Sequence, residues 1–514
     1  MGVLTIKMEL TEKDFDYELQ ALVKSFFPGA ICGLEVEQWQ MKLSIVLETD
    51  EIGVSVLTDR GCQEGKRQVS GDGDWHKKAD KTAHPYRTYY KNILKKLVWE
   101  QLRDFPEEWL PENTIRTLPP WGTMTGVRPT KIPMNLLLQG RKTEEVMAEL
   151  LETYCCDRAK AELGIAIAQK EAGLLRAHHY DEGYSLYVGI PFCPTTCLYC
   201  SFPSYPFEKF GHLADDYVKA LKQEISGVAH MMKDKKLTSV YIGGGTPTAL
   251  EAEQLQELIS HLYQCFPIND SVEFTVEAGR PDSITREKLQ VLREQGVDRI
   301  SVNPQTMQQK TLDLIGRKHT VEQTKQAFAM ARELGFSNIN MDLIIGLPGE
   351  TEDDFADTLR QIEQMDPDSV TIHSLVIKRA SRLRTVLEEQ GALGESETVR
   401  GQRMETMLRM GEQFAKQHRY EPYYMYRQKN SAGHAGSTGQ ENIGYAREGS
   451  ECLYNILIME EMQTILAVGA GASTKLYHQD RGQVSRIENV KSITDYIGRV
   501  EEMIRRKADA IELL

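Results

Sequence analysis

The chain has 514 residues, of which 41% are apolar and 26% are charged, and its formal net charge is −14. This composition is ordinary for a soluble globular protein with about three domains, and its acidity disfavours nucleic acid and anionic membranes as partners. There is no run of about 18 apolar residues and no export signal, so we expect a cytoplasmic protein without a membrane span.

Residues 1–120 predict a small α+β domain. Residues 4–10 and 41–48 alternate apolar and polar residues, as half-buried strands do. Residues 14–27 and 89–101 have apolar residues at helical spacing, and Gly71 to Asp74 marks a turn. The sequence does not indicate what this domain does. Residues 121–180 are predicted to be a helical connector.

Residues 181–375 alternate short apolar runs with amphipathic segments of helical length. This rhythm predicts a parallel sheet with crossover helices. The expected strands lie near 185–190, 239–242, 272–276, 298–302, 338–345 and 369–375. The expected helices lie near 212–234, 251–264, 282–295, 321–335 and 352–365. Six units are too few for a closed eight-fold barrel, so we expect an open, partial α/β barrel whose chemistry lies at the carboxyl ends of the strands.

From residue 376 the alternation stops. Residues 378–384 are basic, 395–417 have a helical pattern, and 428–444 are rich in Gly, Ser, Asn and Gln. We therefore predict a separate, mainly helical C-terminal region over 376–514 that covers the mouth of the barrel.

Three of the nine cysteines crowd into eight positions directly after the first predicted barrel strand, as Cys193-Pro-Thr-Thr-Cys197-Leu-Tyr-Cys200. Thiolates are soft ligands for iron–sulfur clusters or zinc. Three cysteines on one loop can hold three corners of a cubane and leave the fourth iron open. The alternatives are three core cysteines, or a structural zinc whose fourth ligand is distant.

This C-x3-C-x2-C pattern, with Tyr199 before the last cysteine, resembles the signature of the radical S-adenosylmethionine (SAM) superfamily. The resemblance implies a [4Fe–4S] cluster held by Cys193, Cys197 and Cys200, whose open iron binds SAM. One electron from the cluster then splits SAM into methionine and a 5′-deoxyadenosyl radical, so the cofactor carries the chemistry.

Further residues follow the other predicted strands. Gly243-Gly244-Gly245-Thr246 follows the second strand and resembles the glycine-rich motif of this superfamily that holds the SAM amino group. Glu277 ends the third strand, Gln305 follows the fourth, and Asp342 lies in the fifth. Carboxylates and amides can hold ribose hydroxyls and an amino group. Arg317 could bind the SAM carboxylate as a planar fork.

Over about 183–375 the chain is similar in motif order and spacing to the oxygen-independent coproporphyrinogen III oxidase family. The segments from Trp121 to Ile132 and from Tyr426 to Asn430 resemble its HemZ-type branch. Two positions differ from the well-studied branch, because Gly189 replaces a histidine and the segment from Ser201 to Ser204 lacks a fourth cysteine.

The resemblance implies an oxidoreductase that decarboxylates two propionates of coproporphyrinogen III to vinyl groups, giving protoporphyrinogen IX in heme biosynthesis. Tyr187 and Arg382 are the candidate catalytic residues, and Tyr187, Tyr199, Gly243, Gly244, Gly245, Thr246, Glu277, Gln305, Arg317 and Asp342 are the candidate SAM contacts. A basic edge from Lys378, Arg379, Arg382 and Arg384 would suit a tetracarboxylate substrate. An electron donor such as flavodoxin or ferredoxin is the implied partner.

Two other functions stay open. One is a heme-binding chaperone on the same scaffold, although its His-Asn-x-x-Tyr-Trp type of motif is replaced here by Glu441-Asn-Ile-Gly-Tyr-Ala446. The other is radical chemistry on a different tetrapyrrole.

Overall fold

The computed structural model describes residues 3–48, 50–69, 85–200, 204–376, 382–389, 397–428, 441–480 and 482–512. The chain divides into two compact units. The first unit contains residues 1–169, 395–405 and 426–441, and the second contains residues 170–394, 406–425 and 442–514. In the described part of the chain, no helix combines the length and the apolar character that a membrane crossing requires.

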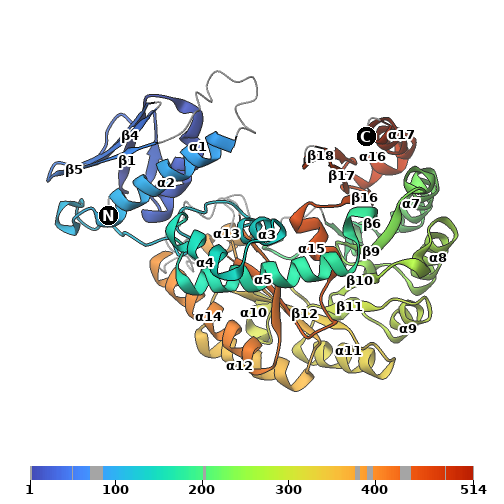
Figure 1. Ribbon diagram of the computed structural model, residues 1–514. Helices are drawn as coiled ribbons and strands as arrows, with labels where there is room; N and C mark the ends of the chain where they lie inside the picture. The colour runs from blue at the N-terminus through green and yellow to red at the C-terminus, as the bar shows by residue number, and fades with distance from the viewer. Residues whose placement is uncertain are drawn as a thin grey trace. The chain divides into compact units, whose positions relative to one another are not determined.

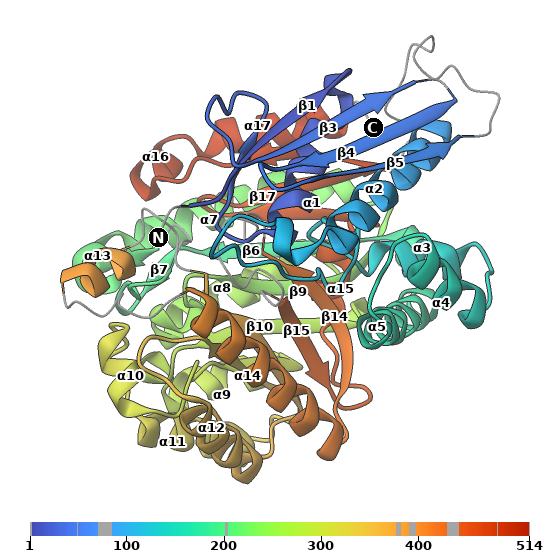
Figure 2. The same ribbon diagram turned by 90° about the vertical axis from the view of Figure 1, so that its left-hand side faces the viewer.

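The first unit begins with a five-stranded sheet in the order β2-β1-β3-β4-β5. Its strands are β1 (Thr5–Leu10), β2 (Ile31–Gly33), β3 (Met41–Leu47), β4 (Glu51–Leu57) and β5 (Cys62–Gln68), and its helices are α1 (Asp16–Phe26) and α2 (Pro85–Asp104). Alternate residues of β3 and β4 are buried against these helices, which lie on one face of the sheet (Figures 1 and 2). The predicted strands and helices of this domain are confirmed, whereas the predicted turn from Gly71 to Asp74 lies outside the described residues.

Three helices follow in the connector, namely α3 (Lys131–Leu138), α4 (Thr143–Glu152) and α5 (Arg158–Ala177). Trp121 precedes them and is 1% exposed. Its indole Nε1 donates a hydrogen bond of 2.7 Å to Glu441, whose second oxygen forms an ion pair of 2.7 Å with Lys160. Because both carboxylate oxygens have partners, the buried Glu441 is compensated and fixes the segment that begins at Trp121.

The second unit is built on six parallel strands that are neighbours in chain order. They are β6 (Gly183–Ile190), β9 (Lys236–Gly244), β10 (Glu273–Gly279), β11 (Arg299–Val302), β12 (Ile339–Ile345) and β13 (Ser369–Ser374). Crossover helices cover their outer face (Figure 1), namely α7 (Ala214–Val228), α8 (Ala252–Cys265), α9 (Arg286–Glu294), α10 (Gln309–Leu314), α11 (Val321–Glu333) and α12 (Glu352–Met365). The predicted open, partial α/β barrel is therefore confirmed.

Local sequence signals explain where several of these helices begin. The side chains of Thr320 and Thr351 each accept a hydrogen bond from the backbone N–H three residues later, and the side chains of Gln323 and Asp354 accept one from the backbone N–H of the cap residue. These capping boxes satisfy N–H groups that the helix itself leaves unpaired. Thr285 caps α9 in a similar way.

The C-terminal region contains the predicted helices, but it also adds strands that the sequence analysis missed. Its helices are α13 (Arg382–Glu389), α14 (Glu397–Gln417), α15 (Leu453–Glu460), α16 (Ile493–Gly498) and α17 (Val500–Ile511). Its strands are β14 (Glu421–Arg427), β15 (Glu441–Ala446), β16 (Thr464–Val468), β17 (Ser473–His478) and β18 (Gln483–Glu488). β15 pairs antiparallel with β13 and β16 pairs parallel with β6, so these strands extend the barrel sheet at both ends. The predicted mainly helical region therefore also carries strands that were not predicted, because both edges of the open sheet offer unpaired backbone groups that these strands satisfy.

Candidate functional site

The three cysteines follow the carboxyl end of the first barrel strand. β6 ends at Ile190, and the chain continues into β7 (Phe192–Cys193), which pairs with β8 (Tyr205–Pro206) before the short helix α6 (Phe207–Phe210). Cys193 is buried, whereas Cys197 and Cys200 are half-buried. All nine cysteines are free thiols, so none of the three is committed to a disulfide.

The thiol of Cys193 lies in an environment that disfavours the thiolate. Burial raises the pKa of Cys193 to about 11, the Thr246 hydroxyl opposes this by donating a hydrogen bond of 3.6 Å, and Cys197 and Cys200 raise the pKa further. Because each neighbouring thiolate makes the next one harder to form, three thiolates here need a positively charged group between them.

No cluster of three or more His, Cys, Asp or Glu side chains within the described ranges is close enough to hold one metal ion. The thiolates of a cubane each bind a different iron, so they lie farther apart than the ligands of one ion. The three thiols share one loop, and Cys197 and Cys200 are near enough to raise the pKa of Cys193. These residues could hold an iron–sulfur cluster.

The glycine run lies directly beside Cys193. Gly245 donates a backbone hydrogen bond of 2.7 Å to Ile190. A Cβ atom at Gly245 would lie 2.5 Å from the Phe192 carbonyl oxygen and 3.0 Å from the Cys193 sulfur. Gly244 has a φ of +112°, which other residues rarely adopt. The close approach of β9 to the cysteine loop therefore requires glycine at both positions.

Glu277, in β10, joins the glycine run to an aromatic cluster. Its carboxylate accepts hydrogen bonds from the Tyr241 hydroxyl and from the backbone N–H of Gly244. Burial and the nearby Asp342 raise the pKa of Glu277 to about 7, although the hydrogen bonds from Tyr241 and Gly244 oppose them. The group can therefore bind a cation or hold a proton near neutral pH.

Three tyrosines form a stack from three elements. Tyr187 of β6 lies 6.3 Å from Tyr241 of β9 and 6.1 Å from Tyr454 of α15, and Tyr241 and Tyr454 lie 4.3 Å apart, all measured between ring centroids. The three rings are within 20° of parallel. The sequence analysis singled out Tyr187 but missed Tyr454, because nothing local links residue 454 to the barrel.

Gln305 and Asp342 are connected through the backbone. Gln305 has a φ of +70°, its N–H donates to the Asp342 carbonyl oxygen (3.0 Å), and its own carbonyl oxygen accepts from Ile344 (2.8 Å). Such a conformation is unusual outside glycine and is held here by both neighbours. Burial raises the pKa of Asp342, but His373 and Asn340 outweigh this effect and hold the pKa below its usual value. Asp342 therefore stays ionised at neutral pH.

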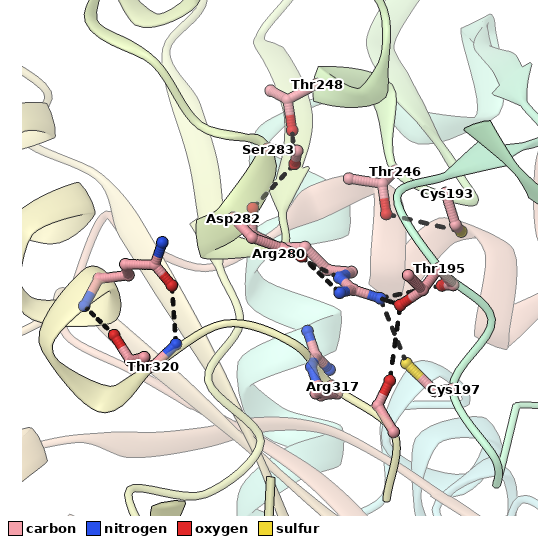
Figure 3. Close-up of polar contacts among 12 residues, drawn as sticks. Cys193, Thr195, Cys197, Thr246, Thr248, Arg280, Asp282, Ser283, Arg317 and Thr320 are labelled. Carbon is pink, nitrogen blue, oxygen red and sulfur yellow. Dashed lines mark hydrogen bonds and ion pairs between the residues drawn. The ribbon is translucent and has the colours of Figure 1, made fainter. Parts of the chain in front are cut away.

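Arg280 supports the cysteine loop and was missed by the sequence analysis. Figure 3 shows its guanidinium between Asp282 and Thr195. It forms hydrogen bonds of 2.9 and 2.6 Å with the two carboxylate oxygens of Asp282. It also donates to the Thr195 carbonyl oxygen (2.9 Å) and hydroxyl (2.7 Å), and it approaches the Cys197 sulfur at 3.9 Å. No sequence motif marks Arg280 as a site residue. The one signal in the sequence is its position directly after β10.

Arg317 forms a hydrogen bond with Tyr199, the residue before the last cysteine of the loop. Arg317 is 4% exposed and donates to the Tyr199 hydroxyl (3.0 Å) and to the Asn303 carbonyl oxygen (3.0 Å). Its Nε is buried without a hydrogen-bond partner among the described residues. Burial also raises the pKa of Tyr199, so this phenol remains a neutral partner.

The predicted basic edge is only partly described. Arg382 is the first residue of α13 and is exposed, and the next residue, Leu383, donates a backbone hydrogen bond of 3.1 Å to Leu198 in the cysteine loop. Arg384 forms an ion pair of 2.8 Å with Glu388. The candidates Lys378 and Arg379 lie outside the described residues.

Comparison with known proteins agrees with this architecture. Residues 187–362 match the family model of the radical SAM superfamily. The oxygen-independent coproporphyrinogen-III oxidase-like protein HemZ of Bacillus subtilis is 40% identical over 396 residues, which are 76% of this chain and 77% of HemZ. The chain therefore belongs to the radical SAM superfamily and, within it, to the HemZ-type family of oxygen-independent coproporphyrinogen-III oxidase-like proteins. The cofactors of this class are a [4Fe–4S] cluster and SAM.

Other relatives carry two different names. The heme chaperone HemW of Bacillus subtilis is 37% identical over 38% of this chain and 51% of its own length. The oxygen-independent coproporphyrinogen III oxidase of Escherichia coli is 34% identical over 38% of this chain and 42% of its own length. The solved structure of coproporphyrinogen III oxidase from Escherichia coli aligns with a TM-score of 0.49 at 25% identity, covering 65% of this chain and 73% of that chain.

Proposed function

We propose that Cys193, Cys197 and Cys200 ligate three irons of the [4Fe–4S] cluster and that SAM binds the fourth. The observation that carries this proposal is the cysteine loop at the carboxyl end of β6, packed so closely against Gly245 that a Cβ there would lie 2.5 Å from the Phe192 carbonyl oxygen. Arg280 fixes the loop through Thr195, and its positive charge near Cys197 stabilises a cluster that carries thiolate charge.

SAM is proposed to lie across the neighbouring strand ends. The backbone of Gly243, Gly244 and Gly245 and the carboxylate of Glu277 suit its amino group, and Arg317, through its unpartnered Nε, suits its carboxylate. The other proposed contacts, which line the same end of the barrel, are Tyr187, Tyr199, Thr246, Gln305 and Asp342.

The proposed reaction is the oxidative decarboxylation of coproporphyrinogen III to protoporphyrinogen IX. When bound, the cluster and SAM would supply hydrogen-atom abstraction at the propionate β-carbon; the vinyl group would then form as carbon dioxide leaves and one electron passes to an external electron acceptor. The names of HemZ and of the Escherichia coli oxidase support this substrate. Tyr187, in its stack with Tyr241 and Tyr454, would orient the reacting groups and exclude water.

The C-terminal region is proposed to cover the barrel mouth, and Arg382 to bind a substrate carboxylate there. The hydrogen bond between Leu383 and Leu198 supports this position for α13. Since an exposed guanidinium can bind carboxylates bidentately, Arg382 suits a propionate. We also propose a flavodoxin or ferredoxin as electron donor and a reducing, cytoplasmic location, which nine free thiols favour.

The test is a turnover assay on the full chain, reconstituted without air and supplied with dithionite and SAM. The proposal expects 5′-deoxyadenosine together with protoporphyrinogen IX from coproporphyrinogen III. Formation of 5′-deoxyadenosine without a vinyl product would contradict the substrate but not the cofactors.

A heme chaperone is the second candidate, and it is favoured by the match to HemW. If the chain is a heme chaperone, we expect stoichiometric heme binding without turnover of coproporphyrinogen III. The same preparation is titrated with hemin, and binding is followed by absorbance. Hemin binding without a vinyl product indicates the chaperone, whereas a vinyl product indicates the oxidase whether or not hemin binds.

A further inference from the structure

The first unit contains a cavity of about 620 Å³ that the radical chemistry does not use. It lies between α1, α2 and the segment that follows Trp121, and the end of β14 contributes to it. Its volume is within the range of about 300–1,000 Å³ that is common for small-molecule sites. Its lining includes Thr123 to Pro129, Arg427 and Gln428. These residues come from the two segments that resemble the HemZ-type branch and to which the proposed reaction gives no role.

The charged side chains of this cavity are nearly all cationic. Five of them are positive, namely Lys24, Lys91, Lys95, Arg128 and Arg427, whereas Glu18 is the carboxylate of the lining. The whole chain has a net charge of −14, so this local excess of positive charge runs against the composition. Like charges gathered in a concave site repel each other and attract anions.

Lys95 is the buried cation of this lining. It is 8% exposed, and its ammonium donates a hydrogen bond of 3.1 Å to the Thr125 hydroxyl. Among the described residues Thr125 is its hydrogen-bond partner and no carboxylate forms an ion pair with it, although an ammonium has three N–H donors. Burial, together with Lys91 and Arg427 and against the opposing charge of Glu18, lowers the pKa of Lys95 to about 8. A buried lysine without a counter-ion destabilises the fold unless an anion compensates it.

Arg427 is fixed in the same wall. Its backbone N–H donates to the Val127 carbonyl oxygen (2.7 Å), and its Nη1 donates to the Met124 carbonyl oxygen (2.8 Å). These contacts hold the segment around Thr125 beside the end of β14, so that Lys95 and Arg427 influence each other. Two cations from distant parts of the chain are thus held rigidly at one cavity.

We propose that this cavity binds a small organic polyanion, whose clustered phosphate or carboxylate oxygens are held by Lys91, Lys95 and Arg427. This proposal does not depend on the proposed chemistry of the barrel and stands even if that chemistry fails. Tyr17, Tyr154 and Ile132 also line the cavity and give the less polar part of such a ligand a surface to contact.

The test is calorimetric titration of the full chain, without SAM, with inorganic triphosphate and separately with citrate. We expect one of the two probes to bind, and the one that binds tells whether the site takes phosphate or carboxylate groups. The variant Lys95→Met should weaken that binding by at least about 10-fold, because a charged hydrogen bond is lost. Lys96→Met is the matched control and should bind normally, since Lys96 is the next residue of α2, does not line the cavity and donates to the Glu152 carbonyl oxygen.

If Lys95→Met does not fold, as judged by circular dichroism, Lys91→Gln provides the same comparison from a half-buried position. Failure of both probes to bind would overturn the proposal. Binding that is equally tight in Lys95→Met, Lys91→Gln and the wild type would overturn it as well.

Discussion

Among single residues, the three cysteines of the loop after β6 differ from the other six in their setting. They share one loop, and Cys197 and Cys200 raise the pKa of Cys193. We predict that Cys197→Ala abolishes cluster binding and SAM cleavage, because the remaining two thiolates cannot hold a cubane. Cys62→Ala, on an exposed thiol of β5, should keep both. Iron and sulfide content per chain and 5′-deoxyadenosine formation are the measurements; full iron content in Cys197→Ala would refute the ligand assignment.

Glu277 gives SAM binding a pH dependence. Burial raises its pKa from 4.5 to about 7, so the folded protein binds more protons than the unfolded chain between these values, and its contribution to folding stability falls as the pH rises through them. Binding of the SAM ammonium group has the opposite pH dependence, because it needs Glu277 in its ionised, carboxylate form. Tyr241 and Gly244 donate to this carboxylate, and Asp342 and Arg299 face it with opposite charges.

We therefore predict that the affinity for SAM rises about 10-fold between pH 6 and pH 8, as the ionised fraction of Glu277 increases. Glu277→Gln should weaken binding and remove this dependence. Equilibrium dialysis with labelled SAM across the pH range measures both effects. An unchanged pH profile in the variant would show that Glu277 does not bind the amino group.

The site residues differ in how visible they are in the sequence. Cys193 and Gly245 are predictable because each follows a strand in a short pattern with a chemical reason, and Glu277 because it is a carboxylate near the carboxyl end of its strand. Arg280 and Tyr454 are not, because their roles depend on contacts with Thr195 and Tyr187, which lie 85 and 267 positions away in the chain. No local spacing carries such information.

At the scale of elements, the end of β9 sets how closely the cysteine loop can pack. We predict that Gly245→Ala displaces this loop and lowers iron content at least several-fold, because its Cβ would overlap the Phe192 carbonyl oxygen. Gly173→Ala is the control, since nothing lies within 4 Å of its Cβ in α5 and alanine favours the helix by about 1 kcal/mol. Normal iron content in Gly245→Ala would contradict this prediction, because it would show that the cysteine loop accommodates the added Cβ.

Helix α17 is attached to α7 by a buried ion pair. Lys507 and Glu224 are fully buried and 2.7 Å apart, and Glu224 also accepts from Tyr496 and from the backbone of Gly469. We predict that Lys507→Met lowers the free energy of unfolding by about 3–5 kcal/mol, because it leaves a buried carboxylate without its counter-ion.

Urea unfolding at neutral pH measures the effect of Lys507→Met. Arg505→Met, on the exposed side of the same helix, should change the unfolding free energy by no more than about 0.5 kcal/mol. Equal effects of the two substitutions would contradict the importance of the ion pair.

The sequence predicted the six barrel strands well, because each is a short apolar run between helices of strong amphipathic pattern. It missed the strands of the C-terminal region for identifiable reasons. β16 is a five-residue apolar run whose partner, β6, lies about 280 residues earlier. β18 is a largely polar edge strand, and its neighbour β17 alternates buried and partly exposed residues. β15 pairs with the edge of the barrel sheet at β13, and β14 follows it, so tertiary pairing rather than local propensity places them.

In the whole molecule, two kinds of site occur in two compact units. The second unit carries thiols, glycines and carboxylates at the strand ends of a partial barrel, and the first carries a cationic cavity. The composition of the chain indicated neither, because a net charge of −14 averages over both units. Both candidate sites therefore depend on side chains that the fold brings together and not on the average composition.

The most direct test is the metal content and electron paramagnetic resonance of the full chain prepared without air. We predict about four irons per chain and, after reduction with dithionite, a [4Fe–4S]⁺ signal that changes when SAM is added. Zinc or no metal at this loop, or a cluster signal that SAM leaves unaltered, would contradict the account.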